Sequence, residues 1–231
     1  MLLLFDIDGT LLRTQGVGVA AMAEALRELH DGREFSFEGV EIAGRLDTLI
    51  WRDVMSRHGL EASAELHDRF RCAYARHLER RLAESPGVAR LMPGVPALLR
   101  ALRADSRRHL GLVTGNYGET GRLKIRASGL DPDQFTINAF ADDGPDRRSL
   151  PGVALRRFRE THGRDASAST TVVIGDTPHD VDCARASGCL AVAVATGDFD
   201  RGELEEHRPD LVLDDLADTA AFLRWLESAR A

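Results

Sequence analysis

Two aspartates, Asp6 and Asp8, stand two positions apart between the apolar run at residues 2–5 and Gly9. Where a buried strand ends and the chain turns, carboxylates at this spacing can both face one crevice. One carboxylate can attack phosphorus and carry an aspartyl-phosphate, while a second carboxyl group moves the protons. The pair therefore predicts a phosphoryl-transfer site, with a magnesium ion and a phosphate between Asp6 and Asp8.

A second polar motif, Thr114-Gly115-Asn116, follows the apolar run at residues 110–113. Thr114 offers a hydroxyl donor, Gly115 lets the backbone approach a ligand closely, and the N-terminus of the following helix presents unpaired N–H groups. These groups suit a phosphate oxygen. We expect Thr114 to act in the reaction, and Gly115 and Asn116 to bind the substrate.

A third polar segment contains Asp176 and Asp180 and follows the apolar run at residues 172–174. Asp176 can complete an oxygen-ligand set for Mg²⁺, which prefers a few carboxylates together with waters and a substrate phosphate. Asp180, one helical turn later, would bind the metal, a metal-bound water or its own loop. Either residue alone is more typical of a helix cap or a turn. Their joint placement with Asp6 and Asp8 at strand ends favours a metal site.

Short apolar runs recur along the chain, with helical segments between them. This alternation indicates a Rossmann-like α/β fold, in which helices cover both faces of a mostly parallel sheet. Ligands of such open sheets bind beyond the carboxyl ends of the strands, where the three polar segments fall. The expected strands cover residues 2–7, 109–113, 136–140, 171–174, 190–194 and 211–213.

About a hundred residues separate the first two expected strands, far more than one crossover connection requires. We therefore expect an α-helical cap domain at residues 14–90, inserted into a core domain formed by residues 1–13 and 91–231. Within the cap, one apolar stripe recurs at every fourth position and should pack the cap's own helices. The stripe consists of Leu66, Phe70, Tyr74, Leu78 and Leu82.

The composition narrows the class of protein. Among 231 residues, 30 are basic and 37 acidic, and the net charge of −7 gives no attraction for nucleic acid or an anionic membrane. Three cysteines without a C-x-x-C pair indicate neither a disulfide framework nor a cysteine zinc site. The N-terminal apolar run is too short for a signal segment or a membrane span. We expect a cytoplasmic protein that acts on a small metabolite, and the sequence leaves its oligomeric state open.

The set of motifs resembles the haloacid dehalogenase-like hydrolase superfamily over essentially the whole chain. That family has an N-terminal D-x-D-G-T-L, a Thr or Ser after a later strand, a basic residue, and a late G-D-x-x-x-D. The sequence reads D-I-D-G-T-L at residues 6–11 and G-D-T-P-H-D at residues 175–180. The helical insertion resembles the family's C1 cap. Its Gly44-Arg45-Leu46-Asp47 is similar to the G-R-T-D loop of phosphoglycolate phosphatase-like members, with leucine in place of threonine.

The resemblance implies roles for the matching residues. Asp6 would be the nucleophile and Asp8 the general acid and base. Mg²⁺ would be held by Asp6, the backbone carbonyl of Asp8, and Asp176. Independently of the resemblance, Arg45 stands in a glycine-containing cap loop that can close over the crevice, so we expect it to bind a second anionic group of the substrate. A salt bridge within the cap is the alternative.

The basic residue departs from the family pattern. Family members commonly carry a lysine in a K-P-x-P segment, but residues 143–150 read D-G-P-D-R-R-S-L. We expect Arg147 to bridge the phosphate and Asp6, with Arg148 as the second candidate, because a guanidinium can neutralise the same charge. Two exposed arginines at a helix start are the alternative. The only lysine, Lys124, lies about two and a half turns into a helix, so we expect it on the surface.

Together these features predict a Mg²⁺-dependent phosphatase that hydrolyses a small phosphorylated metabolite through an aspartyl-phosphate on Asp6. Phosphoglycolate is one candidate substrate. Asp8 argues against a dehalogenase, and a cap without lysine argues against a phosphonatase that forms a Schiff base. A phosphomutase of the same superfamily is one alternative. A second is a non-catalytic binding or regulatory protein on the same fold, which only the missing lysine favours. A third is a scaffold that uses the cap stripe as an interaction surface, which an exposed apolar patch would favour.

Overall fold

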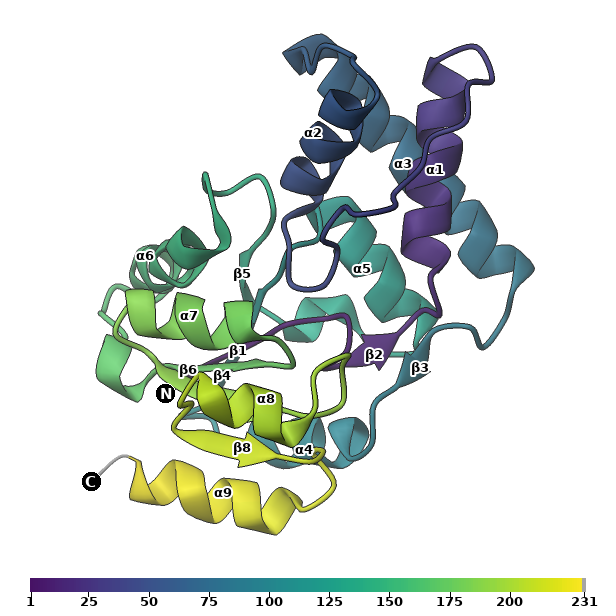
Figure 1. Cartoon of the computed structure of the whole chain (residues 1–231). Coiled ribbons are helices and arrows are strands. Elements are labelled where there is room, and N and C mark those ends of the chain that lie inside the picture. The colour runs from purple at the N-terminus through teal and green to yellow at the C-terminus, as the bar shows by residue number, and fades with distance from the viewer. Residues whose placement is uncertain (230–231) are drawn as a thin grey trace.

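A single parallel sheet of six strands forms the centre of the protein (Figure 1). The computed structural model describes residues 1–229, so the last two residues of the expected core segment, 230 and 231, lie outside the described residues. The sheet has the strand order β5-β4-β1-β6-β7-β8, and this confirms the predicted α/β fold. Its strands are β1 (Leu2–Phe5), β4 (His109–Val113), β5 (Ile137–Ala139), β6 (Val172–Gly175), β7 (Leu190–Val194) and β8 (Leu211–Leu213).

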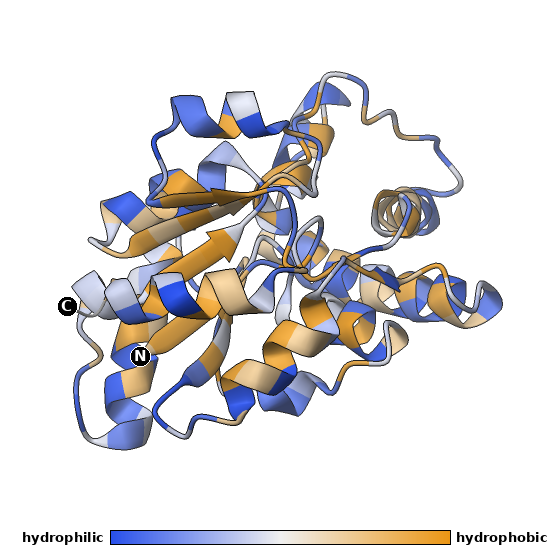
Figure 2. Ribbon diagram, turned by 90° about the horizontal axis from the view of Figure 1, so that it is seen from below, coloured by the Kyte–Doolittle hydropathy of each residue, from blue (hydrophilic) through white to orange (hydrophobic). Residues whose placement is uncertain are grey.

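Side chains of β1 alternate between two hydrophobic cores, one on each face of the sheet. Leu2 and Leu4 belong to the core under α6, α7 and α8, whereas Leu3 and Phe5 belong to the core under α4, α5 and α9. Figure 2 shows the hydrophobic strands lying between helices whose outer faces are hydrophilic. The helices are α4 (Val95–Arg103), α5 (Gly118–Ala127), α6 (Leu150–His162), α7 (Pro178–Ala186), α8 (Arg201–Glu206) and α9 (Thr219–Ser228).

Three helices lie between the first strands of the chain and α4, above one end of the sheet (Figure 1). They are α1 (Val17–Leu29), α2 (Asp47–Arg57) and α3 (Ala64–Glu84). α1 and α3 pack against each other. Four residues of the predicted stripe, Phe70, Tyr74, Leu78 and Leu82, are buried, and the fifth is partly buried. The stripe therefore packs the helices of this insertion.

A short antiparallel ribbon joins the insertion to the sheet domain. β2 (Leu12–Arg13) pairs with β3 (Arg90–Leu91), so the chain leaves and returns at neighbouring points. We propose this ribbon as the boundary between the cap at residues 14–90 and the core. Three short 3₁₀ helices complete the described part of the chain, η1 (Pro132–Gln134), η2 (Arg147–Ser149) and η3 (Ala168–Thr170). Across residues 1–229, no helix combines the length and the apolar character needed to cross a membrane.

Local sequence determines the conformation of the turn after β1 and of the segment that begins α7, which carry most of the acidic residues of the predicted site. Gly9 has a φ of +80°, and a Cβ there would overlap the carboxylate of Asp176, so the turn after β1 requires glycine. The N–H of Asp6 donates to the carbonyl of Ile174 at 2.9 Å, which ties the end of β1 to β6. α7 begins with Pro178 in its first turn and a capping box in which the Asp180 carboxylate accepts the N–H and the hydroxyl of Thr177.

Candidate active site

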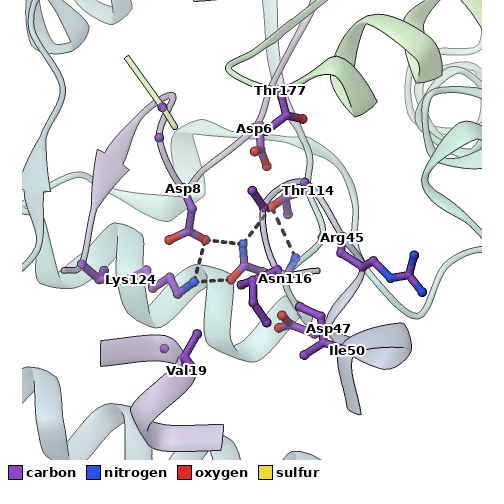
Figure 3. Close-up of a pocket in the computed structure, with 18 of the residues that line it drawn as sticks. Asp6, Asp8, Val19, Arg45, Asp47, Ile50, Thr114, Asn116, Lys124 and Thr177 are labelled. Atoms are coloured by element: carbon purple, nitrogen blue, oxygen red, sulfur yellow. Dashed lines mark hydrogen bonds and ion pairs between the residues drawn. The ribbon is translucent and has the colours of Figure 1, made fainter. Parts of the chain in front are cut away.

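A cavity of about 340 Å³ lies between the carboxyl ends of β1, β4 and β6 and the helices of the cap (Figure 3). β1 lies at the centre of the sheet with β4 and β6 on either side, so the polar residues that follow these strands meet at one edge. Predicted site residues from all three segments line the cavity, together with Arg45 and Arg147. Those from the three segments are Asp6, Asp8, Thr114, Gly115, Asn116 and Asp176.

Three buried carboxylates form an acidic cluster, and two of them, Asp6 and Asp176, line the cavity. Asp6, Asp176 and Asp180 each offer an oxygen within 4.8 Å of the others. Burial raises the pKa of Asp6 to about 6, although the charge of Arg147 opposes the shift. Burial and the neighbouring carboxylates also raise the pKa of Asp176 well above its ordinary value. Burial and the neighbouring carboxylates therefore disfavour the charged forms of both aspartates.

Arg147 is the cation of this cluster. Its Nη2 lies 3.2 Å from Oδ2 of Asp6 and 2.5 Å from Oδ1 of Asp180, and its side chain is only 7% exposed. Its Nη1 donates to the carbonyl of Gly44 in the cap loop at 2.9 Å. Arg148, the second candidate, lies on the surface with a side chain 63% exposed and pairs with Asp182 instead. The structure therefore brings Arg147, and not Arg148, to Asp6.

Lys124 is not on the surface, and this expectation was wrong. The residue is buried, and its Nζ lies 2.6 Å from Oδ2 of Asp8 and 2.6 Å from Oδ1 of Asn116. Figure 3 shows Lys124 of α5 in contact with Asp8, which follows β1, and with Asn116, which follows β4. Burial lowers the pKa of Lys124, but the charges of Asp8 and Asp47 outweigh it, so the net shift is upward and the ammonium stays charged.

The geometry of α5 explains the error. The helix begins at Gly118 rather than near Asn116, and its buried face consists of Thr120, Gly121, Lys124 and Ile125. Side chains of a helix point back toward its N-terminus, so the long stem of Lys124 passes over the preceding turn toward the end of β4. The small residues three and four positions before Lys124 were the signal in the sequence that could have placed it inward.

Asn116 links Asp8, which follows β1, to Thr114, which follows β4. The amide of Asn116 donates from Nδ2 to Oδ2 of Asp8 at 2.9 Å and to Oγ1 of Thr114 at 2.9 Å. Gly115 has a different neighbour from the one expected, because a Cβ there would overlap the carbonyl of Arg45 in the cap loop. The carbonyl of Gly115 also accepts the N–H of Asp47 at 2.7 Å. In this structure the close approach at Gly115 serves the cap.

The cap loop carries Arg45 at the edge of the cavity. Its guanidinium pairs with Asp53 at 2.6 Å and with Glu41 at 3.3 Å, both residues of the cap. This is the salt-bridge alternative of the sequence analysis. A second anionic group of a substrate would share or replace these carboxylates at Arg45.

Asp47 is a buried acid of the cavity that the sequence analysis named only as part of a motif. Its Oδ2 accepts the backbone N–H of Tyr117 at 3.2 Å, although about 70 residues separate the two in sequence. Burial raises the pKa of Asp47 to about 7, partly offset by the charge of Lys124 and the bond from Tyr117. No spacing in the sequence predicts this contact, since it depends on how the cap docks on the core.

The acidic cluster fits a divalent cation by its chemistry. Three carboxylates, which follow two strand ends, supply hard oxygen ligands. Of the groups named above, only Arg147 carries a positive charge that balances them. Asp180 already accepts hydrogen bonds from Arg147 and Thr177, which leaves Asp6 and Asp176 as the carboxylates with fewer partners. The donor set therefore suits Mg²⁺.

Comparison with known proteins agrees with the fold and identifies the family. A family model for haloacid dehalogenase-like hydrolases matches residues 3–185, and the chain belongs to this family. The resemblance drawn from the motifs is thereby confirmed, and the chain is a phosphatase of the haloacid dehalogenase-like hydrolase family.

Particular relatives cover nearly the whole chain. A phosphoglycolate phosphatase of Neisseria meningitidis is 27% identical over 92% of this chain and 88% of its own length. A pyrophosphatase, PpaX, of Listeria monocytogenes is 24% identical over 96% of this chain and 95% of its own. The crystal structure of CbbY from Rhodobacter sphaeroides in complex with phosphate superposes with a TM-score of 0.74, at 20% identity, over 94% of this chain and 95% of that one.

Proposed function

We propose that the chain is a Mg²⁺-dependent phosphomonoesterase that acts on a small phosphorylated metabolite through an aspartyl-phosphate on Asp6. One observation carries this proposal. Asp6 and Asp8 line the same cavity, with Arg147 beside Asp6 and Thr114 within hydrogen-bond reach of the Asn116 amide that also binds Asp8. Nucleophile, acid and phosphate-binding groups thus share one space.

The chain's own residues divide the reaction into two steps. Asp6 attacks phosphorus, and the ester bond breaks as Asp8 gives its proton to the leaving oxygen. Asp8, now a carboxylate, takes a proton from a water that attacks the aspartyl-phosphate and releases phosphate. Thr114 donates its hydroxyl to a phosphate oxygen, and Arg147 balances the charge beside Asp6 throughout.

Magnesium would bind to Asp6 and Asp176, with Asp180 as a further carboxylate of the cluster and the backbone carbonyl of Asp8 as the ligand that the family resemblance implies. When bound, the ion neutralises carboxylate and phosphate charge that would otherwise repel each other. Arg147 keeps the Asp180 carboxylate in place on the far side of this cluster.

The substrate is a small phosphoester. Each basic side chain that lines the cavity already has an acidic partner, since Arg13 pairs with Asp198, Arg45 with Asp53, Lys124 with Asp8, and Arg147 with Asp6 and Asp180. Phosphoglycolate carries a carboxylate that would compete with Asp53 for Arg45. The names of the two relatives above, a phosphoglycolate phosphatase and a pyrophosphatase, make phosphoglycolate and pyrophosphate the first compounds to test.

The test is phosphate release from a metabolite panel that includes these two compounds, sugar phosphates and nucleotides, with Mg²⁺ or with EDTA. The native chain is compared with Asp6→Asn, and Asp182→Asn on the surface of α7 serves as the matched control. We expect release that requires both Mg²⁺ and Asp6 and is unchanged in the control. A folded native chain that releases no phosphate from any compound would overturn the proposal in favour of a mutase or a binding protein.

A further inference from the structure

The only lysine of the chain is buried at the catalytic edge, although the reaction proposed above gives it no role. Lys124 is 5% exposed, and Gly18 of α1 lies beside its amine. A Cβ at Gly18 would lie 3.5 Å from Nζ of Lys124. Burying an ammonium is costly unless it is paired and hydrogen-bonded, so its contacts must account for its position.

Those contacts converge on one oxygen of Asp8. Nζ of Lys124 donates to Oδ2 of Asp8 at 2.6 Å, and Nδ2 of Asn116 donates to the same Oδ2 at 2.9 Å. Lys124 also donates to Oδ1 of Asn116 at 2.6 Å, which turns the amide so that its NH₂ group faces Asp8 and Thr114. Among the described residues, no hydrogen bond reaches Oδ1 of Asp8.

We propose that Lys124 is a positioning residue for Asp8, which with Asn116 fixes Oδ2 and leaves Oδ1 as the oxygen that carries the proton. This inference rests on the proposed phosphatase function. An oxygen that accepts two short N–H bonds is a poor site for a proton, so the O–H bond of the acid forms at the other oxygen. That bond breaks as the proton passes to the leaving oxygen and the P–O ester bond breaks.

The ammonium has a second effect in the same step. Asp8 gains a negative charge as it gives up its proton, and Lys124 lies 2.6 Å from the oxygen that shares this charge. A fixed cation at a site of developing charge stabilises the transition state without rearranging. Lys124 makes its two hydrogen bonds to Asp8 and Asn116, so the proposed effect passes through Asp8.

The leaving group of the substrate separates this role from a purely structural one. An alkyl phosphate needs a proton on its leaving oxygen, whereas p-nitrophenyl phosphate releases a stable anion without one. The value of kcat/KM reports the first half-reaction, in which Asp8 acts as the acid. A positioning residue for the acid therefore affects the alkyl ester selectively, while a packing defect lowers both rates together.

The experiment measures kcat/KM of Lys124→Met for the best alkyl phosphate of the panel and for p-nitrophenyl phosphate. Arg126→Met, an exposed residue on the same helix, is the matched control. We expect a loss of about 10²-fold for the alkyl ester, at the low end of general acid catalysis, and less than about 5-fold for the aryl ester. Equal losses for both esters, or no loss for either, would overturn the inference.

A double-variant cycle tests whether Lys124 acts through Asp8. With p-nitrophenyl phosphate, Asp8→Asn and the double variant Asp8→Asn/Lys124→Met should have the same kcat/KM. The double variant also removes both charges of the pair, so it can be compared even where Lys124→Met alone does not fold. If both Lys124 variants fail to fold by circular dichroism, the residue is structural and the inference is wrong. An inactive native chain would instead overturn the proposed function, and this inference with it.

Discussion

At the scale of single residues, the basic side chains that line the cavity each form an ion pair with a particular acidic residue. Nη2 of Arg147 lies between Asp6 and Asp180, and its Nη1 donates a hydrogen bond to the carbonyl of Gly44 in the cap loop. One side chain thus balances the charge of Asp6 and connects the core to the cap. A guanidinium suits this double task because its donors point in fixed directions.

Replacing Arg147 should therefore damage both stability and activity. Arg147→Ala leaves two buried carboxylates without their cation, and we expect the free energy of unfolding to fall by about 3–5 kcal/mol. Loss of a donor beside the reacting phosphate should lower kcat by at least about 10²-fold. Urea unfolding and phosphate release measure the two effects.

Arg148→Ala is the matched control for this prediction. Its side chain is exposed and pairs with Asp182 on the surface, so both quantities should stay close to those of the native chain. Comparable losses in the two variants would show that Arg147 has no special role at Asp6.

At the scale of elements, the strands could be predicted from sequence, whereas the side of α5 that faces the site could not. Short apolar runs ended by polar residues gave all six strands of the sheet to within about two residues, because buried parallel strands are continuously apolar. The direction of Lys124 depends on where α5 begins, and a shift of two residues turns a helix by about 200°. The position of Asp47 depends on how the cap packs on the core, and no local sequence pattern predicts that packing.

The first residue of α2, Asp47, makes the docked cap sensitive to pH. Its pKa rises from the ordinary 3.8 to about 7 in the folded protein, chiefly because burial disfavours the charged form. Between pH 4 and pH 7 the folded chain therefore holds a proton that the unfolded chain has lost. The unfolded state binds fewer protons in this range, so the contribution of Asp47 to stability decreases as the pH rises.

Asp47→Asn should remove this dependence, because the amide oxygen can still accept the N–H of Tyr117 and carries no charge. We expect the stability of the variant relative to the native chain to increase by up to about 2–3 kcal/mol between pH 5 and pH 8. Urea unfolding of both proteins at the two pH values measures the difference. Parallel pH curves would contradict the raised pKa of Asp47.

At the scale of the whole molecule, the strand order brings distant segments of the chain to one edge. β1 lies between β4 and β6, so residues 6, 114 and 176 become neighbours as soon as the sheet forms. The core could be predicted to this extent because parallel sheets place ligands at strand ends. The cap then closes the cavity from above through Gly44 and Asp47, and these contacts appeared only in the structure.

The acidic cluster links the ends of β1 and β6, so a cation bound there should stabilise the whole fold. A ligand that binds only the folded state at about ten times its Kd adds about 1.4 kcal/mol. For a protein of this size, that free energy corresponds to a rise in Tm of about 3–6 °C. We therefore expect Mg²⁺ to raise the Tm of the native chain, and EDTA to reverse the rise.

Asp176→Asn should abolish most of this rise, because it removes one of the two cluster carboxylates with few other partners. Asp182→Asn, an exposed change on α7, should keep the full effect of Mg²⁺ and so controls for loss of a single acidic charge. Thermal unfolding with and without Mg²⁺ needs no substrate, so it tests the metal site independently of any activity. An equal Mg²⁺ effect on all three proteins would place the ion elsewhere and remove the reason for three carboxylates to lie so close together.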